Sequence, residues 1–165
     1  VDLLAEWMSE NDALVWTPFP AFGRALSKKS GRPFFHHSGV SLTHGSIEEY
    51  TKTDSVILST RSNFQGRNLQ AWNRNLIVGS QPKADLLEQQ IGRTHRQGQK
   101  ADLVTATFFV GSIENLEVID RARGRAQIDR DMGRNKASKL IVCDWCVPPT
   151  YEVLKTHTGP RWRKK

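Results

Sequence analysis

Short apolar runs alternate along the chain with amphipathic or charged segments. The apolar runs are rich in β-branched and aromatic residues, and they predict strands at 13–19, 33–39, 55–60, 75–80, 103–111 and 139–145. The intervening patterns predict helices at 21–29, 85–97 and 113–132, and a helical turn at 46–50 that is capped by Ser46. Since the central runs are apolar on both faces, we expect an α/β fold whose parallel central sheet is covered by helices on both sides.

Length and charge limit the organisation of the chain and its partners. The 165 residues fit one domain, which we place at 1–132, followed by a C-terminal extension and basic tail at 133–165. The net charge of +7 attracts polyanions, and nucleic acid is one of them. We find no apolar run near the ~20 residues that span a bilayer, and no secretion leader, so we expect a cytoplasmic protein without membrane contact.

Two cysteines, Cys143 and Cys146, stand in the sequence CDWC. The spacing is compatible with half of a zinc site, but a structural zinc site needs four ligands. The simpler interpretation is two reduced cysteines on or near a strand, and we expect no metal site.

The segment 85–99, DLLEQQIGRTHRQGQ, carries the clearest candidate chemistry. On a helix, Gln89, Arg93 and Arg96 share one polar stripe at positions i, i+4 and i+7. The opposite side carries Leu87, Ile91 and Thr94. Two arginines one turn apart repel each other unless an anion lies beside them, and guanidinium groups match phosphate oxygens in geometry. From the spacing alone, a solvated helix with ordinary surface arginines is the simpler alternative.

Three segments together resemble superfamily-two helicases of the Swi/Snf-like type. The segment QQIGRTHRQGQ (89–99) resembles motif VI, ILSTRSNFQGRNLQAWN (57–73) resembles motif V, and LVWTPF (14–19) resembles motif IV. The resemblance covers about two-thirds of the chain, roughly 13–113. It departs from the family at 62–65, SNFQ, where a glycine-rich pair is usual.

The resemblance implies a three-layer RecA-like domain that forms the second lobe of an ATP-dependent DNA helicase or translocase. Arg93 and Arg96 would be arginine fingers, and Gln89 would act beside them near the phosphates. The residues expected to lie against the nucleotide are Gly66, Asn68 and Gly92. The expected DNA contacts are Ser59, Thr60, Arg61, Arg67, Trp72 and Arg74; of these, Trp72 and Arg74 follow from the mixed aromatic and basic sequence QAWNRN.

ATP and Mg²⁺ would be held mainly by a first, N-terminal RecA-like lobe of the same parent chain, because this sequence contains no phosphate loop. We therefore expect the isolated chain to be inactive as an ATPase. The absence of long insertions favours a bacterial or viral origin, with a nuclear location if the source is eukaryotic. One alternative is a stand-alone DNA-binding module derived from such a lobe, and a weaker one is a zinc-supported protein-interaction domain.

Overall fold

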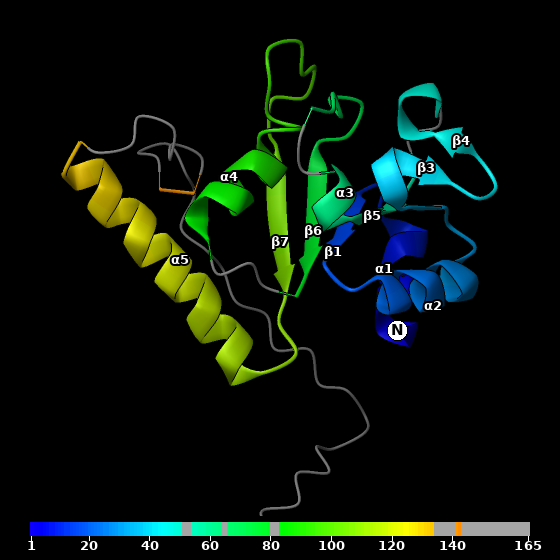
Figure 1. Ribbon diagram of the computed structural model, residues 1–165, viewed down its shortest axis with the longest axis horizontal. Helices are drawn as coiled ribbons and strands as arrows, with labels where there is room; N and C mark the ends of the chain where they lie inside the picture. Colours follow the sequence, from blue (N-terminus) through cyan, green and yellow to red (C-terminus); the bar gives the residue numbers. More distant parts are fainter. Residues whose placement is uncertain (51–53, 64–65, 80–82, 134–140, 143–165) are drawn as a thin grey trace, which may run out of the picture.

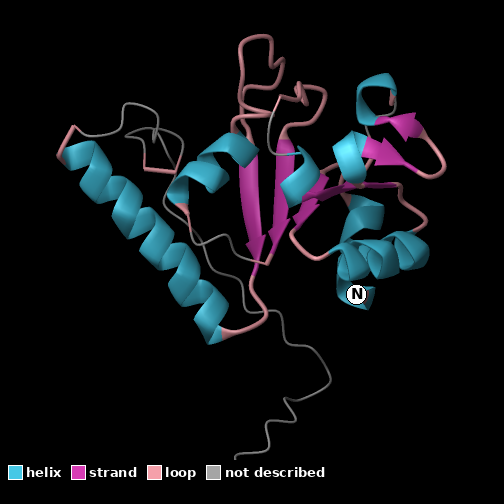
Figure 2. Cartoon of the chain, in the orientation of Figure 1, coloured by secondary structure: helices cyan, strands magenta, loops and turns pink. Residues whose placement is uncertain are grey.

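Five parallel strands form the centre of the computed structural model, which describes residues 1–50, 54–63, 66–79, 83–133 and 141–142 (Figures 1 and 2). The strands lie in the order β2-β5-β1-β6-β7. Their bounds are Leu14–Thr17 (β1), Phe34–Phe35 (β2), Val56–Ser59 (β5), Arg74–Val78 (β6) and Thr105–Phe109 (β7). All four neighbouring pairs are parallel, so the carboxyl ends of the strands share one edge of the sheet.

Helices cover both faces of this sheet. One face packs on α1 (Asp2–Glu10) and α2 (Pro20–Ser30), through a cluster that includes Leu4, Met8, Val15, Leu26, Ile57 and Leu76. The other face packs on α4 (Ala84–Ile91) and α5 (Ile113–Asp131), through Leu14, Trp16, Leu58, Ile77, Leu87 and Ala122. Alternate residues of β1 belong to opposite clusters, as the period-two geometry of a strand requires. The three-layer α/β fold is confirmed.

Local sequence explains where α2 begins and ends. Pro20 occupies the first turn, where its fixed φ suits a helix and its missing N–H has no intrahelical partner. Gly31 follows the last turn with a φ of 71°, and its N–H donates to the carbonyl of Ser27. This left-handed cap favours glycine because a side chain there is strained.

A small two-stranded antiparallel sheet interrupts the path from β2 to β5. It pairs β3 (Val40–Ser41) with β4 (Gly45–Ser46), between the 3-10 turns η1 (His37–Gly39) and η2 (Ile47–Glu49). Ser46 caps η2, as expected, by accepting from the N–H of Glu48. The strand predicted at 33–39 is wrong beyond Phe35, since the backbone turns into left-handed conformations at His37, Ser38 and Gly39.

The helix predicted at 85–97 is also wrong in its second half. It ends at Ile91, and the following N–H groups of Arg93 and Thr94 bond to carbonyls three residues earlier. The Thr94 hydroxyl also donates to the Ile91 carbonyl, at 2.9 Å. Arg93 and Arg96 therefore lie in a turn-rich loop rather than on a helical stripe.

Two further predictions concern the C-terminal part of the described chain. Helix α5 confirms the predicted helix at 113–132 to within one residue at its end. The strand predicted at 139–145 is not present at Ile141 and Val142, and its other residues lie outside the described part of the chain. The division into 1–132 and 133–165 stays a prediction, as do both cysteines' roles, because nearly all of the second segment lies outside the described residues.

Candidate functional site

Two loops run side by side beyond the amino ends of β6 and β7 (Figure 1). Loop A leads from the short helix α3 (Thr60–Asn63) to β6 and is described at 66–73, and loop B, residues 92–104, leads from α4 to β7. The N–H of Leu69 donates to the carbonyl of Arg93 at 3.1 Å, and Gln99 Nε2 donates to the carbonyl of Trp72 at 2.9 Å. The side chain of Gln70 donates to the carbonyl of Gln97. These contacts fix one loop against the other.

Three arginines meet where the loops touch. Arg93 Nη1 and Arg96 Nη1 both approach the backbone carbonyl of Arg67, at 3.5 and 3.3 Å. Both contacts lie near the upper distance limit for a hydrogen bond. Arg93 is half-buried, whereas Arg96 is exposed. Burial, and then the positive charge of Arg96, lowers the pKa of the Arg93 guanidinium, which nevertheless stays charged at neutral pH.

A buried hydrogen-bond network anchors loop B to the sheet. Asn75, in the middle of the sheet, accepts from Trp16 Nε1 at 3.1 Å and donates to the Thr94 hydroxyl at 2.8 Å. Gln99 Nε2 also donates to the carbonyl of Thr94, at 3.0 Å. Asn75 and Thr94 are 1% and 0% exposed, so the backbone between Arg93 and Arg96 is anchored to the core. Asn75 was not predicted as a site residue, although a polar side chain at the start of an apolar strand could have indicated a buried hydrogen bond.

Arg67 combines a carbonyl that faces the other arginines with a side chain that faces the small sheet. Its guanidinium forms an ion pair with Glu48 and donates to the carbonyl of Ser38. Only 14% of the side chain is exposed. Its buried Nε has no hydrogen-bond partner among the described residues. An arginine held in this way offers little of its charge to a passing DNA strand.

The other residues expected at the nucleotide are distributed around this cluster. Gln89 is half-buried on α4, one turn before Arg93. Gly66 has a φ of 74° and Asn68 is exposed, both on loop A. Gly92 has a φ of −62°, an ordinary right-handed conformation, so its backbone does not demand glycine. The neighbouring Gln90 is fully buried on α4, and its Nε2 donates to the Thr60 hydroxyl at 3.3 Å.

The six expected DNA contacts do not form one surface. Ser59, Thr60 and Trp72 are buried, at 2%, 4% and 3% exposure. The Trp72 ring packs in the core, and its Nε1 donates to the carbonyl of Asp54 at 3.0 Å. The predicted stacking of Trp72 on bases is therefore wrong in this conformation, because aromatic stacking needs an accessible ring face.

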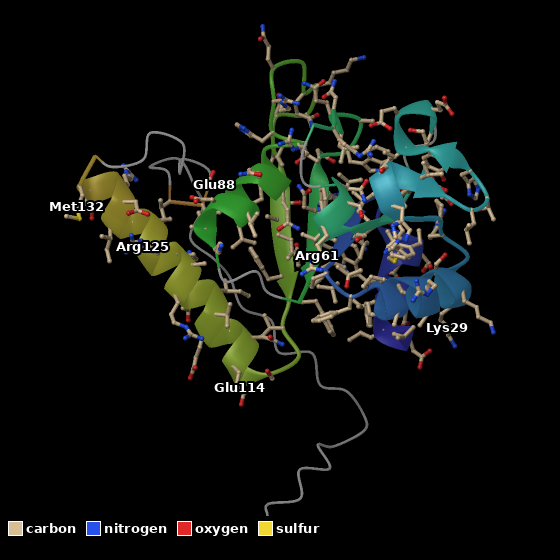
Figure 3. The ribbon with its side chains drawn as sticks, in the orientation of Figure 1. Lys29, Arg61, Glu88, Glu114, Arg125 and Met132 are labelled. Atoms are coloured by element: carbon tan, nitrogen blue, oxygen red, sulfur yellow. The ribbon has the colours of Figure 1, made fainter. Side chains whose placement is uncertain are left out.

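Arg61, labelled in Figure 3, and Arg74 are both exposed, but they lie at opposite ends of the parallel strands. Arg61 is in α3, directly after the carboxyl end of β5, whereas Arg74 opens β6 at the amino edge. Arg74 Nη1 also donates to Asn11 Oδ1 at 3.1 Å.

The described residues also bear on a metal site and on a membrane span. Within those ranges, no three histidine, cysteine, aspartate or glutamate side chains come together as a metal site would require. The helices of the same ranges include none with the length and apolar character of a transmembrane span.

Comparison with known proteins bears on the fold. Neither a protein-family model nor a curated protein matches the chain. The crystal structure of the C-terminal part of the Fun30 ATPase domain is similar, with a TM-score of 0.55 and 17% sequence identity. The similarity covers 73% of this chain but 44% of that one, so this chain spans less than half the length of the structure it matches. At this identity the likeness concerns architecture: the chain has the fold of a RecA-like lobe, with a five-stranded parallel sheet between helices.

Proposed function

We propose that this chain is the second lobe of a Swi/Snf-like, superfamily-two ATP-dependent DNA helicase or translocase. In this proposal Arg93 and Arg96 act as arginine fingers on ATP and Mg²⁺ that are bound mainly by the first, N-terminal lobe. The observation that carries the proposal is the convergence of Arg93 and Arg96 on one carbonyl oxygen, at 3.5 and 3.3 Å.

Two like charges held together favour an anion beside them. A phosphate oxygen is a charged acceptor whose geometry matches that of guanidinium groups. The anchoring of Thr94 to Asn75 supports a catalytic use, because it holds the backbone between the two arginines before any ligand arrives. Preorganised charge of this kind stabilises negative charge that develops on a transferred phosphoryl group.

The fold supports the choice of lobe. The similar structure is named as part of an ATPase domain, and specifically its C-terminal part. An arginine-bearing lobe without its own phosphate loop fits a site completed from another lobe, with Gln89, Gly66, Asn68 and Gly92 near the shared nucleotide. DNA contact would then come from exposed basic residues such as Arg61 and Arg74.

The test is the DNA-stimulated ATPase rate of the full-length protein. Replacing Arg93 or Arg96 by Ala should lower kcat by about 10²-fold or more, because arginine fingers act on the transition state. Arg125→Ala is the matched control, since Arg125 is exposed on α5 and pairs with Asp129 on the same helix.

Near-parental turnover in both Arg93→Ala and Arg96→Ala would remove the basis of the proposal. Such a result, combined with retained DNA binding, would favour a DNA-binding module without an ATPase role.

A further inference from the structure

The side chain of Arg67 is enclosed by the small β3-β4 unit. It pairs with Glu48 on η2 and donates to the carbonyl of Ser38 on η1, two turns that lie on either side of β3 and β4 (Figure 1). The pair is asymmetric in exposure, at 14% for the Arg67 side chain and 45% for that of Glu48. A guanidinium that is desolvated in this way needs such partners.

The turn beneath Arg67 has a costly backbone conformation. His37, Ser38 and Gly39 have φ values of 21°, 53° and 72°, and the first two are not glycines. Each such non-glycine conformation costs on the order of 1–3 kcal/mol and persists only where the surroundings enforce it. A side chain at Gly39 would overlap the Arg67 guanidinium. The turn therefore aims the Ser38 carbonyl at Arg67 and leaves room for the guanidinium to lie on it.

The backbone of the same residue holds the arginine pair. The Arg67 carbonyl accepts from both Arg93 and Arg96, so its position sets where their guanidinium groups converge. Among the described residues of loop A, Arg67 therefore forms a link between two regions. Its side chain contacts the small β3-β4 unit, and its carbonyl contacts both Arg93 and Arg96.

We propose that Glu48 and the 37–39 turn position Arg67, and that Arg67 in turn places Arg93 and Arg96 for the incoming phosphate. The proposal rests on the function proposed above for the two arginines, and it deepens that function by assigning Arg67 a positioning role instead of a DNA contact. Glu48 also supplies the negative charge that pairs with the Arg67 guanidinium.

The charge state of Glu48 is consistent with this role. Burial raises the pKa of its carboxyl, but hydrogen bonds from Ser46, its own backbone N–H and Arg67 outweigh that effect and leave the pKa below its ordinary value. Glu48 is therefore ionised throughout the neutral range.

Glu48→Gln in the full-length protein tests the proposal, with Glu49→Gln as the matched control. The two variants lose the same charge one residue apart, and Glu49 is exposed on the same turn. We expect Glu48→Gln to lower kcat about tenfold, because small displacements of catalytic groups are costly. The Kd for duplex DNA and the KM for ATP should stay within twofold of the control.

If Arg67 instead contacts DNA, Glu48→Gln releases a guanidinium and should tighten DNA binding while kcat stays at the control value. That pattern would overturn the proposal.

Side-chain NMR of the protein labelled with ¹⁵N-arginine separates this proposal from the function on which it rests. Glu48→Gln should shift the Nε–Hε resonances of Arg93 and Arg96, whereas Glu49→Gln should not. If the resonances do not move, the positioning role is wrong even where Arg93→Ala abolishes turnover. If they move while Arg93→Ala retains turnover, the positioning role stands and the arginine-finger function fails.

Discussion

Arginines occur in two contrasting regions of this molecule. On loops A and B, Arg93 and Arg96 come from a segment anchored to the core and converge on the carbonyl of Arg67. On α5, where Figure 3 labels Arg125, the bonds given among the described residues stay within the helix: Arg121 Nε donates to the Glu117 carbonyl, and Arg125 pairs with Asp129.

The contrast teaches that positive charge alone does not make a site. Arg125 is exposed and its partner Asp129 is half-buried, and an i, i+4 pair with an exposed member contributes little energy. Convergence of Arg93 and Arg96 on a carbonyl of the other loop requires both backbones to be held in place by other residues. Loop B differs from α5 in the buried hydrogen bonds of Thr94 that hold its backbone, rather than in the number of its arginines.

The largest expected effect on stability comes from removing Asn75, which anchors loop B. Asn75→Ala removes the acceptor of the buried Trp16 indole N–H and one of the two partners of the Thr94 hydroxyl, which keeps its bond to the Ile91 carbonyl. We expect a loss of about 2–3 kcal/mol in the free energy of unfolding, because each buried polar group left without a partner costs about 1–3 kcal/mol. Arg125→Ala should change it by at most about 0.5 kcal/mol. Chemical denaturation measures the free energy of unfolding of both variants. Equal losses in Asn75→Ala and Arg125→Ala would show that the two regions do not differ in this way.

A smaller effect concerns DNA. We expect weak binding of duplex DNA that falls with salt, since counterions are released when phosphates are neutralised. Arg61→Ala should lower the slope of log K against log salt by about one unit, as expected for one lost phosphate contact. Fluorescence anisotropy across a salt series measures this slope, with Arg125→Ala as the control. Binding that is indifferent to salt, or an unchanged slope in Arg61→Ala, would place the DNA contact elsewhere.

The sequence predicted best what depends on local pattern. Helix α2 was expected at 21–29 and is found at Pro20–Ser30, because a proline start and a glycine stop are local signals. The core strands were found from their β-branched runs, and both faces are buried as expected. The motif VI resemblance also singled out Arg93 and Arg96, whose guanidinium groups both approach the Arg67 carbonyl; their role as arginine fingers stays a prediction.

Long-range contacts account for what was missed. Thr94, just after α4, bonds to Asn75, which lies nineteen residues away in the sequence, and helical periodicity does not predict such a contact. Trp72 was expected to stack on bases because it stands in a polar stretch, but its contact with the Asp54 carbonyl places it in the core. Arg67 was expected at DNA, and its partners Ser38 and Glu48 come from a distant segment.

The most direct test of the arginine-finger function compares two affinities of the full-length protein. ADP with aluminium fluoride imitates the transition state of phosphoryl transfer, and a non-hydrolysable ATP analogue imitates the ground state. Because a finger acts mainly in the transition state, Arg93→Ala should weaken binding of the first by about 10²-fold or more, and of the second by much less. Equal losses for the two ligands, or no loss for either, would contradict the account.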